Sequence, residues 1–421
     1  MKIYDVIIIG GGAAGLIAAG RAAELGASVL VLEKNKQVGN KLLMTGGGRC
    51  NFTNHSAPRL IAGAFGKNGR WLLSGLSRFG SEETIKFFQE HGVKIKKEDN
   101  GRVFPEKDSA TEILNALTRY LKQGEGEIQT SATVKQIQTK DNRISRLILE
   151  NGDSIIGRNY IIATGGQSYP GTGSSGDAYT WLTKLSHKII DPRPAISRII
   201  VKDQVKDLGG LSLTNITLYL YQGTKKISIE TGALLFTNHG LSGPAALNLS
   251  RSITRHLNLN NQSALNSKAN QLKIKIDFWP EEDKDNLNQR FKLLSEQNKH
   301  VSLKNILAKL FQKRLADYAL TVTKVKSNQT GDSLTRSDRQ ALVDFFKGYS
   351  LSVQAIGGFN EAMITVGGVD LREINPQTMA SKLIGNLYLA GEVLDLDGPT
   401  GGYNLQASWT TGYLAGENAA Q

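Results

Sequence analysis

The sequence predicts an α/β fold, with a Rossmann-like domain made from both ends of the chain and interrupted by an insertion. The first observation is a strand, a glycine turn, a helix and a second strand within residues 4–32, as in a βαβ unit. The second is a glycine-rich loop, 397–404, that opens a final helix. The third is a change of character after residue 192, where strand-like alternation and then helical sequence poor in glycine replace the α/β pattern.

The elements of the N-terminal part follow in chain order. Apolar residues from Tyr4 to Ile9 predict a strand, Gly10-Gly11-Gly12 a turn, Ala13–Leu25 a helix, and Ser28–Leu32 a second strand that ends at Glu33. A loop rich in Gly, Thr and Asn comes next. This loop is residues 39–54. Helices are expected at 55–122, and hairpins at 128–163, whose last strand leads into Thr164-Gly165-Gly166.

The rest of the chain is predicted to hold the insertion and the return to the first domain. At about 150 residues per domain, 421 residues suggest two or three domains. Strands are clearest at 214–221 and 226–230, and short strands return around 351–366 before a final helix from about Asn404 to Ala420. We therefore expect a cofactor domain (1–192 plus 353–421), an inserted β-rich domain on the substrate side (193–282 plus 348–352) and a small helical domain (283–347).

The positive charge of the chain is concentrated in this insertion. The chain carries a net +13, and residues 193–352 contain 24 Lys and Arg against 13 Asp and Glu, a net +11. A solvated helical surface is the favoured interpretation, and a surface for RNA, anionic lipid or an acidic partner is the alternative. No run along the sequence interleaves aromatic with basic residues, so a nucleic-acid partner is not favoured.

Cysteine content and hydropathy restrict the setting of the protein. The only cysteine, Cys50, excludes an internal disulfide, a thiolate zinc cluster and a redox dithiol. No window reaches 18 consecutive apolar residues, and Asp5 interrupts the start of the only leader-like stretch. We expect a cytoplasmic protein without a membrane span.

The turn after the first strand has the pattern of a dinucleotide-binding fingerprint. Gly10, Gly12 and Gly15 would allow a tight turn, a close approach of the backbone to a pyrophosphate, and close helix packing, while Glu33 would accept the ribose hydroxyls. The fingerprint does not distinguish FAD from NAD. The N-terminus of the last helix would stabilise the negative charge of a reduced flavin, which favours FAD, and no second fingerprint for NAD(P)H follows.

Several further blocks together resemble one family. They are Gly39-Asn40-Lys41 through Gly46-Gly47-Gly48-Arg49-Cys50-Asn51, Ala163–Pro170, Thr172–Asp177, Phe236–Pro244, Thr365–Val369, Thr378–Lys382 and Ala390–Ala407. On these blocks the sequence resembles the aminoacetone oxidase/BaiN-type (YhiN-like) family of bacterial FAD-dependent oxidoreductases. One position departs from the family pattern, because Asn238 fills a slot that is often His, and His239 follows it.

The resemblance implies a set of FAD-binding residues. The ADP half would lie on Gly10, Gly12, Ala13, Ala14, Gly15, Glu33 and Lys34. Lys41, Gly47, Gly48 and Arg49 would line the loop over the cofactor, Val134 the adenine edge, and Thr164 and Gly165 the strand-end turn. Gly391, Glu392 and Asp395 would approach the ribityl chain and the pyrophosphate, and Asn404, Leu405 and Gln406 would donate backbone N–H groups to the isoalloxazine.

Few other residues are candidates for chemistry. Tyr169, His239 and Tyr403 are candidates for the substrate pocket, and no catalytic residue is predicted. Arg49 beside Cys50 would lower the pKa of the thiol, although a small buried hydrophobe is the favoured role for Cys50. The six histidines show no metal-ligand spacing, so no metal site is expected.

The resemblance leaves two reactions open for an FAD-dependent enzyme with a small organic substrate. One is the oxidation of an amine with O₂, and the other is the reduction of an activated C=C bond with NAD(P)H as a transient electron donor. Two other possibilities remain: an RNA-binding flavoprotein similar to the FAD-dependent tRNA-modifying enzymes, and a non-catalytic FAD-binding partner protein.

Overall fold

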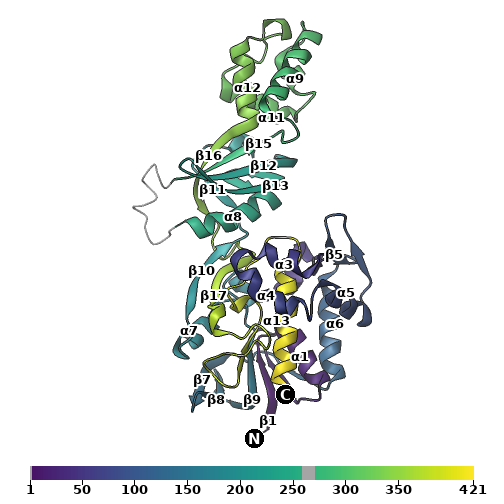
Figure 1. Cartoon of the computed structure of the whole chain (residues 1–421), viewed down its shortest axis with the longest axis vertical. Helices are drawn as coiled ribbons and strands as arrows, with labels where there is room; N and C mark the ends of the chain where they lie inside the picture. The colour runs from purple at the N-terminus through teal and green to yellow at the C-terminus, as the bar shows by residue number, and fades with distance from the viewer. Residues whose placement is uncertain (1, 258–270) are drawn as a thin grey trace. The chain divides into compact units, whose positions relative to one another are not determined.

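The computed structural model describes residues 2–257 and 271–421, and the chain divides into two units. Unit 1 contains the chain up to Pro194 together with Phe359–Gln421, and unit 2 is Ala195–Gly358 (Figure 1). These limits lie two and six residues from the predicted ones, 192/193 and 352/353. In the described residues, no helix is long and apolar enough to cross a bilayer.

Unit 1 is built on a seven-stranded sheet of order β6-β2-β1-β9-β8-β7, with β18 pairing β9. Strands β6, β2, β1, β9 and β18 are parallel, and β7 and β8 complete the sheet as an antiparallel hairpin. The centre of β1 and all of β2 are buried, as expected for parallel strands covered on both faces. The strands are Ile3–Ile9 (β1), Val29–Leu32 (β2), Glu127–Gln129 (β6), Val134–Lys140 (β7), Arg143–Leu149 (β8), Ser154–Ile162 (β9) and Leu387–Leu389 (β18).

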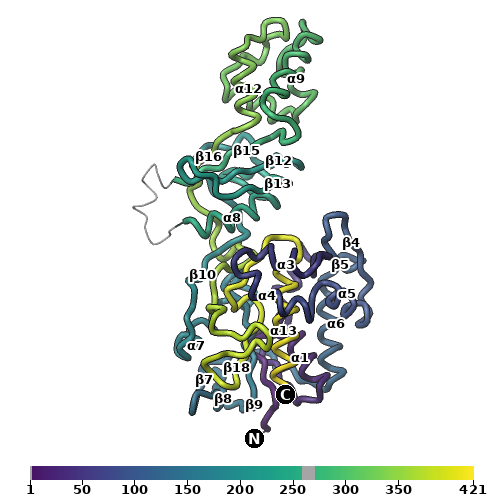
Figure 2. The backbone as a smooth tube through the Cα atoms, viewed as in Figure 1, coloured from purple at the N-terminus to yellow at the C-terminus, as the bar shows by residue number. Residues whose placement is uncertain are grey.

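Helices α1 (Ala13–Glu24) and α13 (Tyr403–Ala419) lie side by side in unit 1, although they come from opposite ends of the chain (Figure 2). Side chains at Gly412 and Gly416 would place Cβ atoms 2.4 Å from the carbonyl O of Ala14 and 2.2 Å from that of Ala18, so glycine is required for this close contact. Because Gly412 meets Ala14 and Gly416 meets Ala18, the two helices are parallel. The part of α13 before Gly412 extends about 13 Å further in the N-terminal direction.

Shorter elements complete unit 1 around this sheet and helix pair. A small antiparallel sheet has the order β3-β5-β4, and β10 pairs β17. The segment 39–54, expected to be a loop, contains the short helix α2 (Asn40–Met44). The other elements are β3 (Thr53–Asn54), α3 (Pro58–Ala64), α4 (Gly69–Leu76), α5 (Ser81–Glu90), β4 (Ile95–Lys97), β5 (Arg102–Pro105), α6 (Ala110–Gln123), α7 (Asp177–Lys184), β10 (Ile189–Ala195) and β17 (Ile364–Val369).

Unit 2 contains a closed antiparallel barrel of order β11-β14-β13-β12-β15-β16. Its strands alternate buried and outward residues; in β12, Leu218 and Leu220 are fully buried. Closure occurs where β11 pairs both β14 and β16. The elements are β11 (Ile199–Val201), β12 (Ser212–Gln222), β13 (Lys225–Thr237), β14 (Gly240–Ser242), α8 (Pro244–His256), β15 (Leu272–Asp277) and β16 (Tyr349–Ile356).

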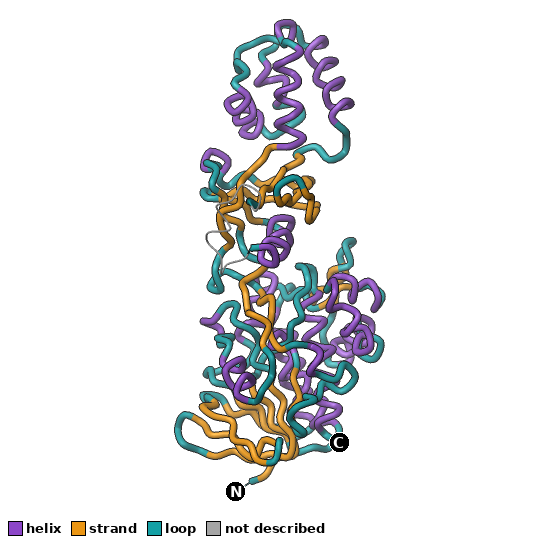
Figure 3. Tube along the Cα trace, turned by 60° about the vertical axis from the view of Figure 1, so that its left-hand side comes forward, coloured by secondary structure: helices purple, strands orange, loops and turns teal. Residues whose placement is uncertain are grey.

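Four helices gather at one end of this barrel, and α8 covers the other (Figure 3). They are α9 (Lys284–Gln297), α10 (Leu303–Leu307), α11 (Lys313–Thr323) and α12 (Arg336–Gly348). One hydrophobic core includes barrel and helix residues, and the rings of Phe311 and Phe346 stack with centroids 3.8 Å apart. A separate helical domain at 283–347 therefore stays a prediction, because this core runs through both parts.

Candidate cofactor site

The turn between β1 and α1 is shaped by three glycines that have different surroundings. Gly10 has φ +107°, and a Cβ there would lie 2.6 Å from the carbonyl O of Ala163. A Cβ on Gly15 would lie 1.9 Å from the carbonyl O of Gly10, so this glycine allows helix and turn to touch. Gly12, by contrast, faces open space with no atom within 4 Å. The open position is the one at which the fingerprint places a pyrophosphate.

Glu33 closes this turn from the end of β2. Its Oε2 accepts a hydrogen bond from the backbone N–H of Gly11 (2.9 Å), and its Oε1 accepts from the backbone N–H and the side-chain amide of Asn35. The carboxylate is buried and lies beside the open position at Gly12. Lys34 is ion-paired with Asp177 (2.6 Å), and Val134 is buried at the start of β7.

The turn after β9 contains a buried hydroxyl without a partner. Oγ1 of Thr164 is buried and makes no hydrogen bond, and its Cα would lie 3.0 Å from a Cβ on Gly10. An unsatisfied buried hydroxyl costs about 1–3 kcal/mol, so a polar ligand at this edge of the sheet would be stabilised by it. Together with the open face of Gly12, this orphaned group fits the phosphate-rich part of a dinucleotide.

A polar network joins four of the sequence blocks next to this edge. Glu392 accepts hydrogen bonds from Ser168 Oγ (2.7 Å) and from the backbone N–H of Thr365 (2.7 Å), and its other oxygen is ion-paired with Lys41 (2.6 Å). Lys41 also donates to Ser168 Oγ (2.5 Å). Lys41 and Glu392 were expected near the cofactor, and the structure brings them together. Ser168 and Thr365 lie in blocks that the family resemblance covers, but no role was predicted for them.

The glycine loop before Arg49 has free space beside its backbone, whereas the Arg49 side chain already has ion-pair partners. Gly47 and Gly48 have positive φ, and a Cβ at either position would meet no atom within 4 Å. The guanidinium of Arg49 binds Asp108 (2.9 Å) and Glu98 (3.0 Å) and lies 4.1 Å from the ring centroid of Phe104. A phosphate or flavin contact of Arg49 stays a prediction, and the structure gives this side chain other partners.

The expectation for the thiol next to Arg49 was wrong. Cys50 is fully buried, and burial raises the pKa of its thiol to about 12. Burial dominates this shift, and the guanidinium of Arg49 is ion-paired with Glu98 and Asp108. A thiol held in its neutral form is a poor nucleophile.

The loop before α13 is fixed by its own side chains. Asn404 accepts from the backbone N–H of Gly398 (2.7 Å) and donates to the carbonyl groups of Gly398 and Pro399. Asn404 and Leu405 lie in the first turn, whose N–H groups have no acceptor within a helix. The prediction for Gln406 is corrected, because its backbone N–H donates to Gly402 O (3.0 Å) and is not available to a flavin.

The other residues predicted in this region contact the protein itself. The backbone N–H of Gly391 donates to Thr411 Oγ1 (2.9 Å), and a Cβ on Gly391 would lie 2.8 Å from that of Ala14. Asp395 accepts hydrogen bonds from the side-chain amide of Asn68. Ala13, Ala14 and Gly165 line the two turns at this edge of the sheet.

The three candidate pocket residues do not belong to one unit. Tyr169 and Tyr403 are half-buried residues of unit 1, and Tyr169 has φ +50°, a strained value for a residue with a side chain. His239 is exposed in the turn between β13 and β14 of unit 2. No group of three His, Cys, Asp or Glu residues with metal-site geometry occurs in residues 2–257 and 271–421.

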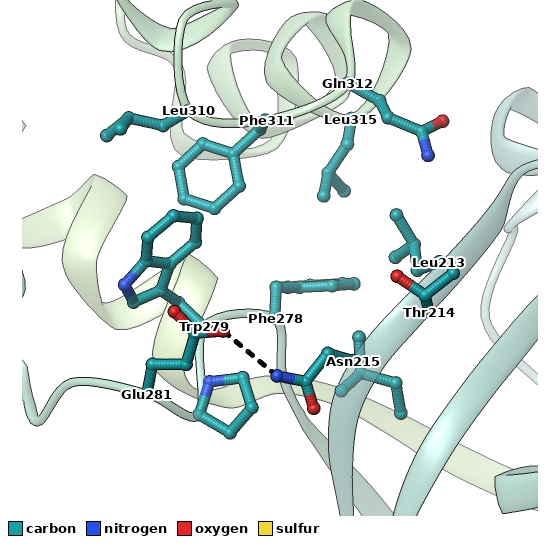
Figure 4. A pocket seen from close by; sticks show the side chains of 12 residues that line it. Leu213, Thr214, Asn215, Phe278, Trp279, Glu281, Leu310, Phe311, Gln312 and Leu315 are labelled. Atoms are coloured by element: carbon teal, nitrogen blue, oxygen red, sulfur yellow. Dashed lines mark hydrogen bonds between the residues drawn. The ribbon is translucent and has the colours of Figure 1, made fainter. Parts of the chain in front are cut away.

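Unit 2 has a separate small pocket between the barrel and α11 (Figure 4). Its volume is about 200 Å³, and Phe278, Trp279 and Phe311 line it. Asn215 donates a hydrogen bond to Glu281 (3.1 Å) at its rim. Ligand pockets usually enclose about 300–1,000 Å³, so this space is too small for a dinucleotide, and none of the predicted site residues lines it.

Comparisons with known proteins agree on one family. A family model described as the HI0933-like protein Rossmann domain matches residues 4–418. The chain is 30% identical over 417 residues to a 3-dehydro-bile acid delta(4,6)-reductase of Clostridium scindens, covering 98% of each chain. It is also 30% identical over 409 residues to a ribosomal RNA dihydrouridine synthase of Haemophilus influenzae, covering 97% of this chain and 96% of the relative.

A solved structure has the same fold. The 3-ketosteroid-delta4-(5alpha)-dehydrogenase from Rhodococcus jostii matches with a TM-score of 0.55 at 15% identity, covering 100% of this chain and 97% of the other. At this identity the likeness establishes the fold alone. The predicted α/β class with a Rossmann-type domain is therefore confirmed.

Proposed function

Because the chain belongs to the HI0933-like Rossmann family and is an FAD-dependent oxidoreductase, we propose that it reduces a C=C bond conjugated to a carbonyl group. Of the two reactions left open by the sequence, this one is favoured over amine oxidation. The non-catalytic alternative is not retained.

The observation that carries the proposal is the reaction shared by two full-length relatives. A 3-dehydro-bile acid with Δ4,6 unsaturation has its double bonds conjugated to the 3-oxo group. Dihydrouridine forms when the C5=C6 bond of uracil, conjugated to the C4 carbonyl, is saturated. Saturating a C=C bond conjugated to a carbonyl group requires a hydride at its carbon remote from the carbonyl and a proton at its nearer carbon, so one kind of site would serve both substrates.

The residues of unit 1 support this chemistry by binding and orientation. The open face at Gly12, the carboxylate of Glu33 and the unpartnered hydroxyl of Thr164 would hold the ADP half of FAD. Bound FAD supplies the hydride from N5 of its reduced ring. The parallel arrangement of α1 and α13 directs both helix N-termini to the same end of the unit, about 13 Å apart, which suits the two ends of an extended dinucleotide.

A tyrosine can supply the proton in this arrangement. The Tyr403 hydroxyl is protonated at neutral pH like that of any tyrosine, and burial raises its pKa, which makes it a weaker acid. Tyr403 begins α13, directly before the first-turn residues Asn404 and Leu405. We assign Tyr403 the role of proton donor to the α carbon.

The proposal is tested by following the flavin under anaerobic conditions. Purified protein is mixed with NADH or NADPH, and bleaching of the flavin reports reduction. A 3-oxo-Δ4 steroid or a uridine-containing RNA is then added, and recovery of the flavin colour with saturation of the substrate is the expected result. If an amine bleaches the flavin without nicotinamide and O₂ restores it with release of peroxide, the protein is an oxidase and the proposal is wrong.

A second candidate concerns the substrate class: a uracil base within RNA in place of a small enone. It is favoured by the net +11 charge of residues 193–352 and by the name of the Haemophilus relative. Transcripts of ribosomal RNA and a steroid enone, offered in parallel to the reduced protein, distinguish the two. Turnover with the enone alone would exclude RNA as the substrate.

A further inference from the structure

One outer face of the unit 2 barrel combines half-buried aromatic rings with exposed lysines. We call it the basic tyrosine face, and it consists of Tyr219 and Tyr221 on β12, Lys226 on β13, and Lys273 and Lys275 on β15. Tyr219 is opposite Lys275, and Tyr221 is opposite both Lys273 and Lys226. The sequence does not show this pattern, because the residues are neighbours only across strands.

The alternation of the strands sets the direction of these side chains. Leu218 and Leu220 are fully buried in the barrel, so Tyr219 and Tyr221 point outward. Ile274 and Ile276 are buried in the same way, so the lysines on either side of Ile274 also point outward. Ile229, opposite Tyr219, adds an apolar side chain that is 49% exposed.

Two of the three lysines of the face lie over the tyrosine rings. Nζ of Lys275 is 4.9 Å from the ring centroid of Tyr221, and Nζ of Lys226 is 5.6 Å from that of Tyr219. Among the residues that the structure describes, Lys226, Lys273 and Lys275 have no carboxylate within ion-pair distance. Their charge therefore remains available to an anionic partner.

The carboxylates of the same strands do not offset this charge. Glu230 is opposite the inward residue Leu218, and burial raises the pKa of its carboxyl group. Asp277, at the end of β15, is ion-paired with Lys347 (2.7 Å). The outer face is thus positive with two aromatic rings at its centre.

We propose that the basic tyrosine face binds a single-stranded segment of RNA. Bases stack on aromatic rings whatever their identity, while lysines neutralise the phosphates between them. Tyr219 and Tyr221 are two residues apart on one strand, about 7 Å, a spacing that successive unstacked nucleotides can span. A membrane surface would use the lysines but would not need two rings at the spacing of successive bases. The inference rests on the second candidate of the proposed function, RNA as the substrate.

The test measures binding of fluorescein-labelled oligouridine to the full-length protein by anisotropy. Wild-type protein is expected to bind the single strand more tightly than a duplex of the same length, with an affinity that falls steeply with salt. Tyr219→Ala with Tyr221→Ala should weaken binding about tenfold or more, and Tyr219→Phe with Tyr221→Phe should restore it, because stacking needs the ring and not the hydroxyl. Thermal unfolding of each variant checks that the barrel is intact.

A matched charge control separates the face from general electrostatics. Lys226→Glu, Lys273→Glu and Lys275→Glu together should abolish binding, whereas Lys299→Glu, Lys313→Glu and Lys326→Glu change the net charge of the same unit equally and should weaken it far less. Equal loss in both triple variants, or binding to anionic phosphatidylserine vesicles without binding to RNA, would overturn the proposal.

The face and the proposed function fail in different ways. If RNA binds at the face but its uridine is not reduced, the RNA-binding role of the face is supported and RNA as the substrate is rejected. If RNA is reduced equally by the lysine triple variant, the substrate stands and the face is rejected. Reduction of the small enone by that variant reports that the flavin site is intact.

Discussion

Replacing Gly12 with alanine separates the ligand-binding role of the glycine turn from its structural role. Gly12 has φ −87° and ψ −167°, values that alanine adopts without strain. An added methyl group meets no protein atom within 4 Å. The free energy of unfolding of the FAD-free protein should therefore change by less than about 1 kcal/mol.

The same methyl group lies where the pyrophosphate of FAD must approach the backbone. Crowding of this kind costs about 1–3 kcal/mol, which corresponds to a loss of FAD affinity of roughly 5-fold to 150-fold. At a concentration 100 times its dissociation constant a ligand stabilises a protein by about 2.7 kcal/mol, so between about a third and nine tenths of this FAD-dependent stabilisation, and of the matching rise in Tm, should disappear. Thermal unfolding with and without FAD and quenching of flavin fluorescence measure both effects.

Gly15→Ala is the matched control for this experiment. Its Cβ would lie 1.9 Å from the carbonyl O of Gly10, so the turn or the helix must shift, and the FAD-free protein should be destabilised by about 1–3 kcal/mol or more. If Gly12→Ala keeps wild-type FAD affinity, or lowers Tm of the FAD-free protein as much as Gly15→Ala does, the assignment of Gly12 to the pyrophosphate is wrong.

Three other predictions concern groups described in unit 1. Lys41→Met leaves the Glu392 carboxylate without its cation and should lower the free energy of unfolding by about 1–3 kcal/mol, whereas Lys41→Arg should lose less; urea unfolding measures both. Burial lowers the pKa of His187 from 6.5, so the unfolded state binds more protons than the folded state. The contribution of His187 to the free energy of unfolding should be fully present above about pH 6.5 and fall as the pH drops below it. Urea midpoints measured against pH should show this dependence, and it should flatten in His187→Gln. The Cys50 thiol, with its pKa raised to about 12, should react with a disulfide reagent only after denaturation, and Cys50→Ser should keep flavin reduction by NAD(P)H; rapid labelling of the native protein would contradict this.

Local patterns in the sequence predicted the parts of the site that depend on neighbouring residues. The fingerprint from Gly10 to Gly15 and the acidic end of β2 at Glu33 lie within one βαβ unit, where strand, turn and helix follow from apolar periodicity and glycine. The expected final helix, 404–420, is α13 within one residue at each end.

Contacts between distant segments could not be predicted in this way. Lys41 and Glu392 are 351 residues apart in the sequence. Only folding brings α2, which contains Lys41, next to the end of β18, which Glu392 follows. Arg49 was assigned to the cofactor because its sequence neighbours are glycines. Its partners in the structure, Glu98 and Asp108, lie just after β4 and β5, far from it in the sequence. The basic tyrosine face likewise depends on the register between β12 and β15.

The glycine contact between α1 and α13 has a consequence for how the protein is made. The ribosome completes α1 and all of unit 2 before it reaches residues 403–419, so the surface of α1 around Ala14 and Ala18 stays uncovered throughout that time. The helix pair beside the cofactor site is therefore completed only after α13 has been made, and FAD should bind only from then on. A nascent chain stalled before Tyr403 should fold its barrel yet remain colourless.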